Sequence, residues 1–202
     1  MLITHEAPIG QAALPARINL RAIFGNDRPV ELEIGCGKGG FLLRQAQAHP
    51  DRNYLGIEWA NEFYKFAVDR MARRKVPNVR ILRADAKHVV IHELPDASLT
   101  AIHVYHPDPW PKKRHHKRRL FTPEFVRGAI RVLAPGGRLA IQTDHAEYFE
   151  QIVAVTSNEA ALTPMSFDNA DFGTIGERVE TNFEIKYARE GRPIHRLAFR
   201  RS

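Results

Sequence analysis

The stretch VELEIGCGKGGF at residues 30–41 decides the fold of this chain. Residues 30–34 predict a short strand, and the glycines that follow predict a tight turn. After the turn, Phe41, Leu42 and Ala46 lie near helical spacing, and Pro50 ends the predicted helix. A strand, a glycine-rich turn and a helix in this order form the first unit of a parallel α/β sheet.

The rest of the chain repeats this alternation. Thr122 and Pro123 are the cap and first turn of one helix, and LAPGG at 133–137 is expected to stop that helix and form a turn. The predicted fold class is therefore α/β, with a mostly parallel sheet and helices on both faces. The other predicted strands are 53–57, 79–84, 99–105, 138–143 and an edge strand at 194–199, and the other helices are 61–75 and 146–157.

Length and composition favour a single globular domain that binds a polyanion. Lys and Arg total 30 against 23 Asp and Glu, which gives a formal charge of +7 over 202 residues. The single cysteine, Cys36, excludes an internal disulfide. No apolar run approaches the roughly 18 residues of a membrane helix, and the first residues lack the layout of a secretory signal. A cytoplasmic protein without membrane contact is expected.

The glycine turn leaves two classes of cofactor open. Gly35, Gly37 and Gly40 match the G-x-G-x-x-G pattern of dinucleotide-binding proteins, but on its own this pattern is weak. Glu33 precedes the first glycine by two residues, where a carboxylate would repel a pyrophosphate. S-adenosylmethionine carries an ammonium and a sulfonium and no phosphate, so Glu33 favours that cofactor over a nicotinamide dinucleotide.

Two more acids end the following predicted strands. Glu58 can accept hydrogen bonds from both hydroxyls of a ribose. Asp85 can accept from an adenine amino group while the Ala86 amide donates to the ring. Each acid alone could simply cap the next helix. Three acids at the ends of successive strands favour a ligand, because open parallel sheets bind ligands at that edge.

A dense basic segment follows the strand at 99–105. Residues 112–119 contain six Lys or Arg in eight positions. Such a run is often a solvated loop, but beside a ligand cleft it favours phosphate binding. Trp110 either stacks a flipped base or anchors the segment by packing. No metal is expected, because His115 and His116 have no Cys or carboxylate at a recognisable ligand spacing.

The segment PDPWPKKRHHKRRL at 107–120 makes a family resemblance specific. Together with LEIGCGKGG at 32–40, GIE at 56–58, ADA at 84–86, TD at 143–144 and TNFE at 181–184, it closely resembles the tRNA (guanine-N7-)-methyltransferase family. The match runs from about Phe24 to the C-terminus, so we expect one methyltransferase domain at 24–202 behind an N-terminal segment at 1–23. The resemblance implies a Rossmann-like class I methyltransferase sheet, S-adenosyl-L-methionine as cofactor, and 7-methylguanosine at position 46 of tRNA as product.

The resemblance also implies roles for individual residues. One departure stands out, because His106 occupies a position where many members carry an aromatic residue. The expected catalytic residue is Asp108. The expected cofactor contacts are Glu33, Gly35, Gly37, Glu58, Asp85, Ala86 and Asp108; the substrate contacts are Lys112, Asp144, Thr181, Asn182, Phe183 and Glu184; and the RNA contacts are Arg114, His115, His116, Lys117, Arg118 and Arg119.

The expected reaction depends on how the guanine is positioned relative to the methyl donor more than on proton transfer. Guanine N7 has a free lone pair, so methylation there requires no general base. A carboxylate can accept from the adjacent N1 and N2 donors of guanine and stabilise the charge of the product, which makes Asp108, Asp144 and Glu184 candidates. Three alternatives stay open: a nicotinamide-dependent dehydrogenase, a non-enzymatic RNA-binding module and an amino-directed methyltransferase.

Overall fold

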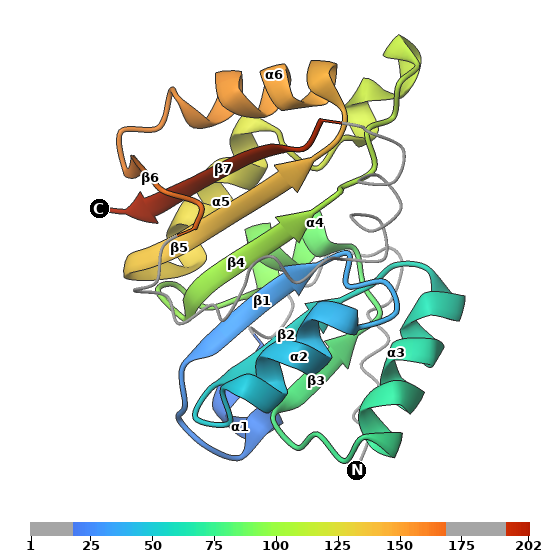
Figure 1. Cartoon of the computed structure of the whole chain (residues 1–202). Helices are drawn as coiled ribbons and strands as arrows, with labels where there is room; N and C mark the ends of the chain where they lie inside the picture. Colours follow the sequence, from blue (N-terminus) through green and yellow to red (C-terminus); the bar gives the residue numbers. More distant parts are fainter. Residues whose placement is uncertain (1–17, 169–192) are drawn as a thin grey trace.

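A mixed sheet with helices on both faces forms the protein (Figure 1). The computed structural model describes residues 18–168 and 193–202. Within them the strand order is β3-β2-β1-β4-β5-β7-β6. The strands are β1 (Val30–Ile34), β2 (Asn53–Ile57), β3 (Val79–Leu82), β4 (Leu99–Tyr105), β5 (Leu133–Thr143), β6 (Leu162–Met165) and β7 (His195–Arg201). The helices are α1 (Leu20–Phe24), α2 (Gly40–Ala48), α3 (Asn61–Arg73), α4 (Ala86–His88), α5 (Pro123–Val132), α6 (Ala146–Thr156), the π-helix η1 (Val89–Glu93) and the 3-10 helix η2 (Lys113–Arg118).

The first five strands are parallel, and β7 runs antiparallel to both of its neighbours. This arrangement confirms the predicted fold class. The predicted edge strand forms as β7, but it lies between β5 and β6. The outer strand, β6, is absent from the sequence prediction. It has only four residues, and one of them, Pro164, is tolerated because an edge strand leaves one side of its backbone unpaired.

The start of β5 corrects a second prediction. Helix α5 does end at Val132, but the following LAPGG stretch belongs to β5 and is not a turn between elements. Leu133 already pairs with Leu99, and the register then shifts so that Arg138 pairs with Ala101. The intervening residues therefore form a bulge, and Gly136 has the left-handed φ of 77° that glycine adopts readily.

The two faces of the sheet bury different residues. Leu32 and Ile34 of β1 join a large apolar cluster with α5 and α6, while Cys36, Leu42 and Ala67 belong to a smaller cluster under α2 and α3. Since side chains alternate along a strand, Glu31 and Glu33 face the α2 side. In Figure 1, α2 lies in front of β2, and α3 lies at the right beside β3.

Several residues before the expected domain start at residue 24 also pack against the core. Phe24 of α1 is buried in the large cluster, and Ile18, Leu20 and Ile23 pack against that cluster. The Asn19 side chain caps α1 by accepting from the Ala22 amide at 2.9 Å. Residues 18–23 therefore belong to the domain because their apolar side chains cover its core.

Candidate functional site

The parallel strands bring most of the predicted site residues to one edge of the sheet. The strands β1, β2, β3, β4 and β5 run in the same direction, so the loops after their carboxyl ends share an edge (Figure 1). The glycine turn, Glu58, Asp85, Asp108 and Asp144 all follow these ends. This is the edge where open α/β sheets bind ligands.

The glycine turn after β1 has free space beside its glycines and is hydrogen-bonded to the end of β2. Gly35 and Gly37 have left-handed φ angles of 71° and 52°, and a Cβ added at either would meet nothing within 4 Å. The amides of Gly35 and Cys36 both donate to the Ile57 carbonyl, at 2.8 and 3.2 Å. A ligand can therefore approach the backbone of this turn closely.

Gly39, which lies outside the G-x-G-x-x-G spacing, makes the closest helix contact in this segment. A Cβ at Gly39 would lie 2.9 Å from Met71 Cε and 3.2 Å from Ala67 Cβ, so Gly39 is where α2 packs against α3. Gly40 has more room, with its nearest contact at 3.6 Å. The sequence pattern selected Gly40 by spacing alone, whereas the close helix contact falls one residue earlier.

Glu58 holds the glycine turn against the end of β2. Its Oε2 accepts from the Gly37 amide and its Oε1 from the Ala60 amide, both at 2.8 Å. These two bonds fix a largely buried carboxylate beside the turn. Each carboxylate oxygen has a second lone pair, so the group keeps the capacity to accept from two ribose hydroxyls.

Glu33 is the most unusual group at this edge. Its side chain is 5% exposed, and its Oε2 has no hydrogen-bond partner among the described residues. Burial raises the pKa of the Glu33 carboxyl well above its ordinary value, against the opposing influence of Arg44 and with a further contribution from Glu58. A cationic ligand would relieve this unfavourable burial. The residues present therefore fit the ammonium and sulfonium of S-adenosylmethionine.

Asp85 caps the next helix, which was the alternative to its predicted role in binding a ligand. Its Oδ1 accepts from the amides of Lys87 and His88, at 2.9 and 3.4 Å, so it caps the short helix α4 that starts at Ala86. The side chain is exposed at the carboxyl edge. Capping fixes its position, and neither of these two bonds involves Oδ2.

The loop after β4 holds Asp108 in an exposed position between unusual backbone conformations. His106 and Trp110 have φ angles of 52° and 43°, which non-glycine residues rarely adopt. The Trp110 ring lies 5.0 Å from the Arg118 guanidinium and 6.0 Å from the His115 ring. These contacts favour the packing role for Trp110, because its ring already supports the basic segment.

A hydrogen-bonded chain connects the ends of β4, β5 and β7. Arg196 Nε donates to Gln142 Oε1 at 2.9 Å, so the Gln142 amide nitrogen faces His106 Nε2 at 3.0 Å and donates to it. His106 Nδ1 must then carry the proton, and it lies 3.4 Å from Asp144 Oδ1. The departure at His106 thus orients a predicted substrate contact. The unusual residue at position 106 is visible in the sequence, but its contact with Asp144 is not.

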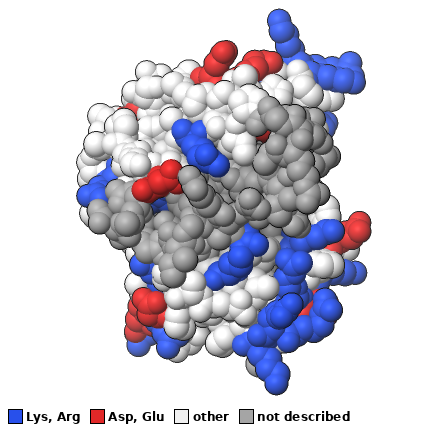
Figure 2. Space-filling model, viewed as in Figure 1, with Lys and Arg blue, Asp and Glu red and all other residues white. Residues whose placement is uncertain are grey.

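The basic segment divides into exposed and buried cations. Lys112, Lys113, Arg114, Lys117 and Arg118 are exposed along η2, while His115 and His116 are half-buried. In Figure 2, Lys and Arg side chains project at the upper right, where Figure 1 draws the loop beyond α6.

Arg119 is buried, so the prediction that it contacts RNA is wrong. Its side chain is 2% exposed, and its guanidinium donates to the Pro109 carbonyl at 2.8 Å, to Gln151 at 2.7 Å and to Glu147 at 3.2 Å. The guanidinium also lies 5.0 Å from the Tyr148 ring. Arg119 fastens the basic segment to α6 and presents no free face to a phosphate.

A buried polar relay lies next to the glycine turn on the α2 side. Glu31 accepts from Arg52 at 2.6 Å and contacts His103 Nε2 at 2.9 Å, while His103 Nδ1 contacts the Tyr105 hydroxyl at 2.9 Å. Burial alone would raise the pKa of Glu31, but His103 and Arg52 outweigh it and lower that pKa. Burial lowers the pKa of His103, against the opposing influence of Glu31. Unlike Glu33, Glu31 is fully paired.

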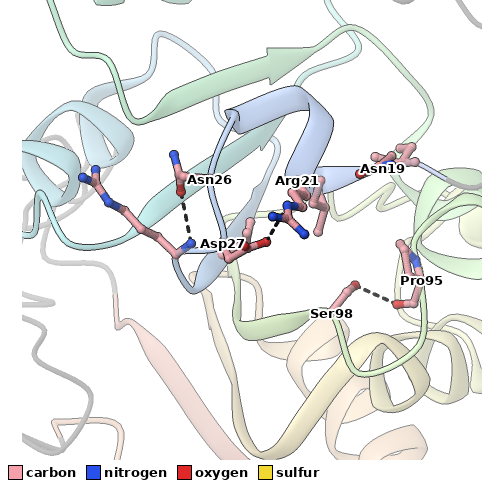
Figure 3. A pocket seen from close by; sticks show the side chains of 10 residues that line it. Asn19, Arg21, Asn26, Asp27, Pro95 and Ser98 are labelled. Atoms are coloured by element: carbon pink, nitrogen blue, oxygen red, sulfur yellow. Dashed lines mark hydrogen bonds and ion pairs between the residues drawn. The ribbon is translucent and has the colours of Figure 1, made fainter.

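A separate hollow of about 470 Å³ lies away from this edge (Figure 3). It includes Asn19, Arg21, Asp27 and Ser98, which precede the amino ends of β1 and β4. Arg21 pairs with Asp27 at 3.2 Å, and the Ser98 hydroxyl donates to the Pro95 carbonyl at 2.7 Å. None of the predicted site residues lines this hollow, so the site is defined by the strand ends.

Some predicted features fall outside what the structure describes. Thr181, Asn182, Phe183 and Glu184 lie within 169–192. Within residues 18–168 and 193–202, no group of three or more His, Cys, Asp or Glu could hold a metal ion. In the same residues, no helix combines the length and apolarity needed to cross a membrane.

Comparison with known proteins agrees with this geometry. Residues 27–197 match a family described as "Putative methyltransferase". The chain is 42% identical over 197 residues to the tRNA (guanine-N(7)-)-methyltransferase of Alkalilimnicola ehrlichii, covering 98% of this chain and 81% of that protein. It is 40% identical over 185 residues to the protein of the same name from Nitrosococcus oceani, covering 92% and 77%. The solved 16S rRNA methyltransferase KamB shares the fold, with a TM-score of 0.63 at 16% identity over 90% of this chain and 92% of that one.

Proposed function

The chain belongs to the tRNA (guanine-N(7)-)-methyltransferase family, and from this premise we propose that it methylates N7 of a tRNA guanine with S-adenosyl-L-methionine as donor. The target is the variable-loop guanosine at the position usually numbered 46. The observation that carries the proposal is Glu33, a buried carboxylate with an unpartnered oxygen beside an open glycine turn. A cation satisfies this carboxylate, whereas a pyrophosphate would be repelled by it.

The carboxyl edge supplies a complementary contact for each part of this cofactor. Glu33 faces its cationic end, and the open backbone of Gly35 and Gly37 admits close approach. Glu58, already oriented by the Gly37 and Ala60 amides, accepts from the ribose hydroxyls. Asp85 and the Ala86 amide recognise the adenine. When bound, the cofactor supplies an electrophilic methyl group on its sulfonium.

The residues after β4 and β5 position the guanine. N7 attacks with its own lone pair, so the protein needs no base and acts by holding the ring in line, an effect worth roughly 7 to 11 kcal/mol in well-oriented reactions. Asp144, oriented by His106, accepts from the N1 and N2 donors. Asp108 lies at the point of transfer and stabilises the positive charge that develops on the ring.

The exposed cations of the basic segment bind the tRNA backbone. Arg114, Lys117 and Arg118 are exposed on η2, which follows the Asp108 loop directly. Lys112 lies between that loop and η2, in reach of the same RNA strand. Arginine suits phosphate because its planar guanidinium donates two parallel hydrogen bonds. His115 and His116 flank these cations as further RNA contacts.

Product analysis on a matched pair of transcripts tests the proposal. The purified protein is incubated with S-adenosylmethionine and either of two tRNA transcripts that differ only by guanosine or adenosine at position 46. Digestion to nucleosides and mass spectrometry should give 7-methylguanosine from the first transcript and none from the second. A base methylated on an exocyclic amino group would assign the chain to amino-directed methylation. 7-methylguanosine from both transcripts would overturn the assigned position.

A further inference from the structure

Helix α3 carries a second concentration of cations, separate from η2. Residues 59–75 contain five Lys or Arg against two acids. Lys38 of the glycine turn lies beside this helix and adds a sixth cation. In Figure 2, Lys and Arg gather at the lower right of the molecule, where Figure 1 places α3. We call Lys38 together with residues 59–75 the α3 surface.

Aromatic side chains are interleaved with these cations. Trp59, Phe63 and Phe66 are 64%, 40% and 38% exposed, and they are three of the four large apolar side chains that are exposed among the described residues. Phe63 and Phe66 are three positions apart on α3, so their rings share one side of the helix, and Trp59 lies just before its N-cap. Exposed large rings that cluster with cations mark a surface that contacts a partner.

The cations are arranged around one of these rings and a hollow. Lys38 Nζ lies 5.3 Å and the Arg70 guanidinium 5.1 Å from the centre of the Phe66 ring. Phe66, Arg70, Arg73 and Arg74 line an open hollow of about 420 Å³. Asp69 pairs with Arg73 at 2.5 Å, which leaves the hollow with a surplus of positive charge. Cation–π contacts hold two of the cations in place.

We propose that the α3 surface is a second binding site for the phosphate backbone of the RNA substrate. The inference rests on the proposed tRNA methylation and extends it to helix α3, which lies outside the family motifs. Charge complementarity identifies the occupant, because a phosphate backbone presents regularly spaced anions that arginine binds through paired hydrogen bonds. The exposed rings add sequence-tolerant contacts to riboses and bases.

The position of α3 relative to the site supports the same occupant. The helix begins three residues after Glu58 and extends about 20 Å away from the carboxyl edge. It lies beside β3 at one end of the sheet, whereas Arg119 connects η2 to α6 beside β5. The target guanine at the edge would therefore lie between two cationic surfaces. A folded RNA that bends around its target base can reach both.

A charge-neutralising double variant tests the inference. Arg70→Gln combined with Arg74→Gln removes two cations from the hollow and leaves the paired Arg73 in place. In filter binding across a salt series, loss of two phosphate contacts should reduce the slope of log affinity against log salt by roughly two units. Arg21→Gln combined with Arg127→Gln is the matched control, because it removes the same charge from exposed positions on α1 and α5. The control should retain the parental slope.

Three outcomes would overturn the inference. An unchanged slope in the α3 variant, or an equal decrease in the control, would mean that the α3 surface makes no specific phosphate contact. Parental tRNA affinity together with loss of binding to phosphatidylserine vesicles would assign the surface to a membrane. Calorimetry with S-adenosylmethionine should give the same affinity in both variants, which excludes misfolding. The proposed function fails separately, if the parent protein itself forms no 7-methylguanosine.

Discussion

Replacing Glu33 by glutamine should move two measurements in opposite directions. The carboxylate is buried with an unpartnered oxygen, and an unsatisfied buried polar group costs about 1 to 3 kcal/mol. Glutamine keeps a polar atom at the same place, so the gain comes from removing the buried charge. At pH values where Glu33 is ionised, the free energy of unfolding of the protein without cofactor should therefore rise by on the order of 1 kcal/mol. For a chain of this length each kcal/mol raises Tm by about 2 to 4 °C. Loss of a charge-assisted hydrogen bond to the cofactor should weaken S-adenosylmethionine binding about 10- to 150-fold.

The pH dependence of these effects follows from the raised pKa of Glu33. A carboxyl whose pKa is higher in the folded than in the unfolded protein makes the fold less stable as pH rises from the unfolded value to the folded one. The stabilisation by Glu33→Gln should therefore be absent below about pH 4 and develop as pH rises above the unfolded carboxyl pKa. Cofactor affinity of the parent should fall as pH drops through the raised pKa, and the variant should lose this dependence.

Glu31→Gln is the matched control, since Glu31 is buried on the same face of β1 but paired with Arg52 and His103. Its pKa is lowered, so it contributes stability above the unfolded carboxyl pKa that is lost as pH falls through the folded one. Glu31→Gln should therefore lower Tm at neutral pH. Thermal denaturation and calorimetry of both variants provide the measurements. A fall in both stability and cofactor affinity in Glu33→Gln would refute the reasoning, because it would show general damage to the site.

Three further substitutions separate chemistry, orientation and structure. Asp108→Asn keeps the shape and removes the charge, so single-turnover methylation should slow well beyond twofold while tRNA affinity stays near parental; a rate within twofold would remove Asp108 from the chemistry. His106→Phe removes the hydrogen bond to Asp144 and should lower the methylation rate without changing S-adenosylmethionine affinity, whereas an unchanged rate would leave His106 without a positioning role. Arg119→Gln breaks a buried network and should lower Tm by several degrees with the salt dependence of tRNA binding unaltered; a reduced salt slope at parental Tm would restore Arg119 as a phosphate contact.

The central strands and helices could be predicted because each carries a strong local signal. The bounds of β1, β2 and β4 agree with the structure, since β1 alternates apolar and acidic residues, β2 and β4 are mostly apolar, and turn residues flank them. The short strand β6 has no such signal, and its place depends on pairing with β7, more than thirty residues away. The family resemblance is confirmed, and with it the class of S-adenosylmethionine-dependent methyltransferases.

The residues of the site could be located from sequence more readily than their partners. Strand ends predict which acids share an edge, because that follows from the direction of the chain. The chain of hydrogen bonds from Arg196 to Asp144 joins three strands and has no sequence signature. The burial of Arg119 was missed for the same reason: in a run of cations, only packing against α6 distinguishes it from its neighbours.

The close contact at Gly39 connects the glycine turn, where the cofactor is proposed to bind, with α3, where the RNA is proposed to bind. The start of α2 and the middle of α3 approach so closely that a Cβ at Gly39 would require Met71 and Ala67 to shift. A movement of α3 is therefore transmitted to the glycine turn, and a ligand that fixes the turn restrains α3. Any coupling between the two is reciprocal: the factor by which RNA on α3 changes cofactor affinity equals the factor by which cofactor changes RNA affinity. The strength of the coupling between the two substrates would then depend on this contact between helices.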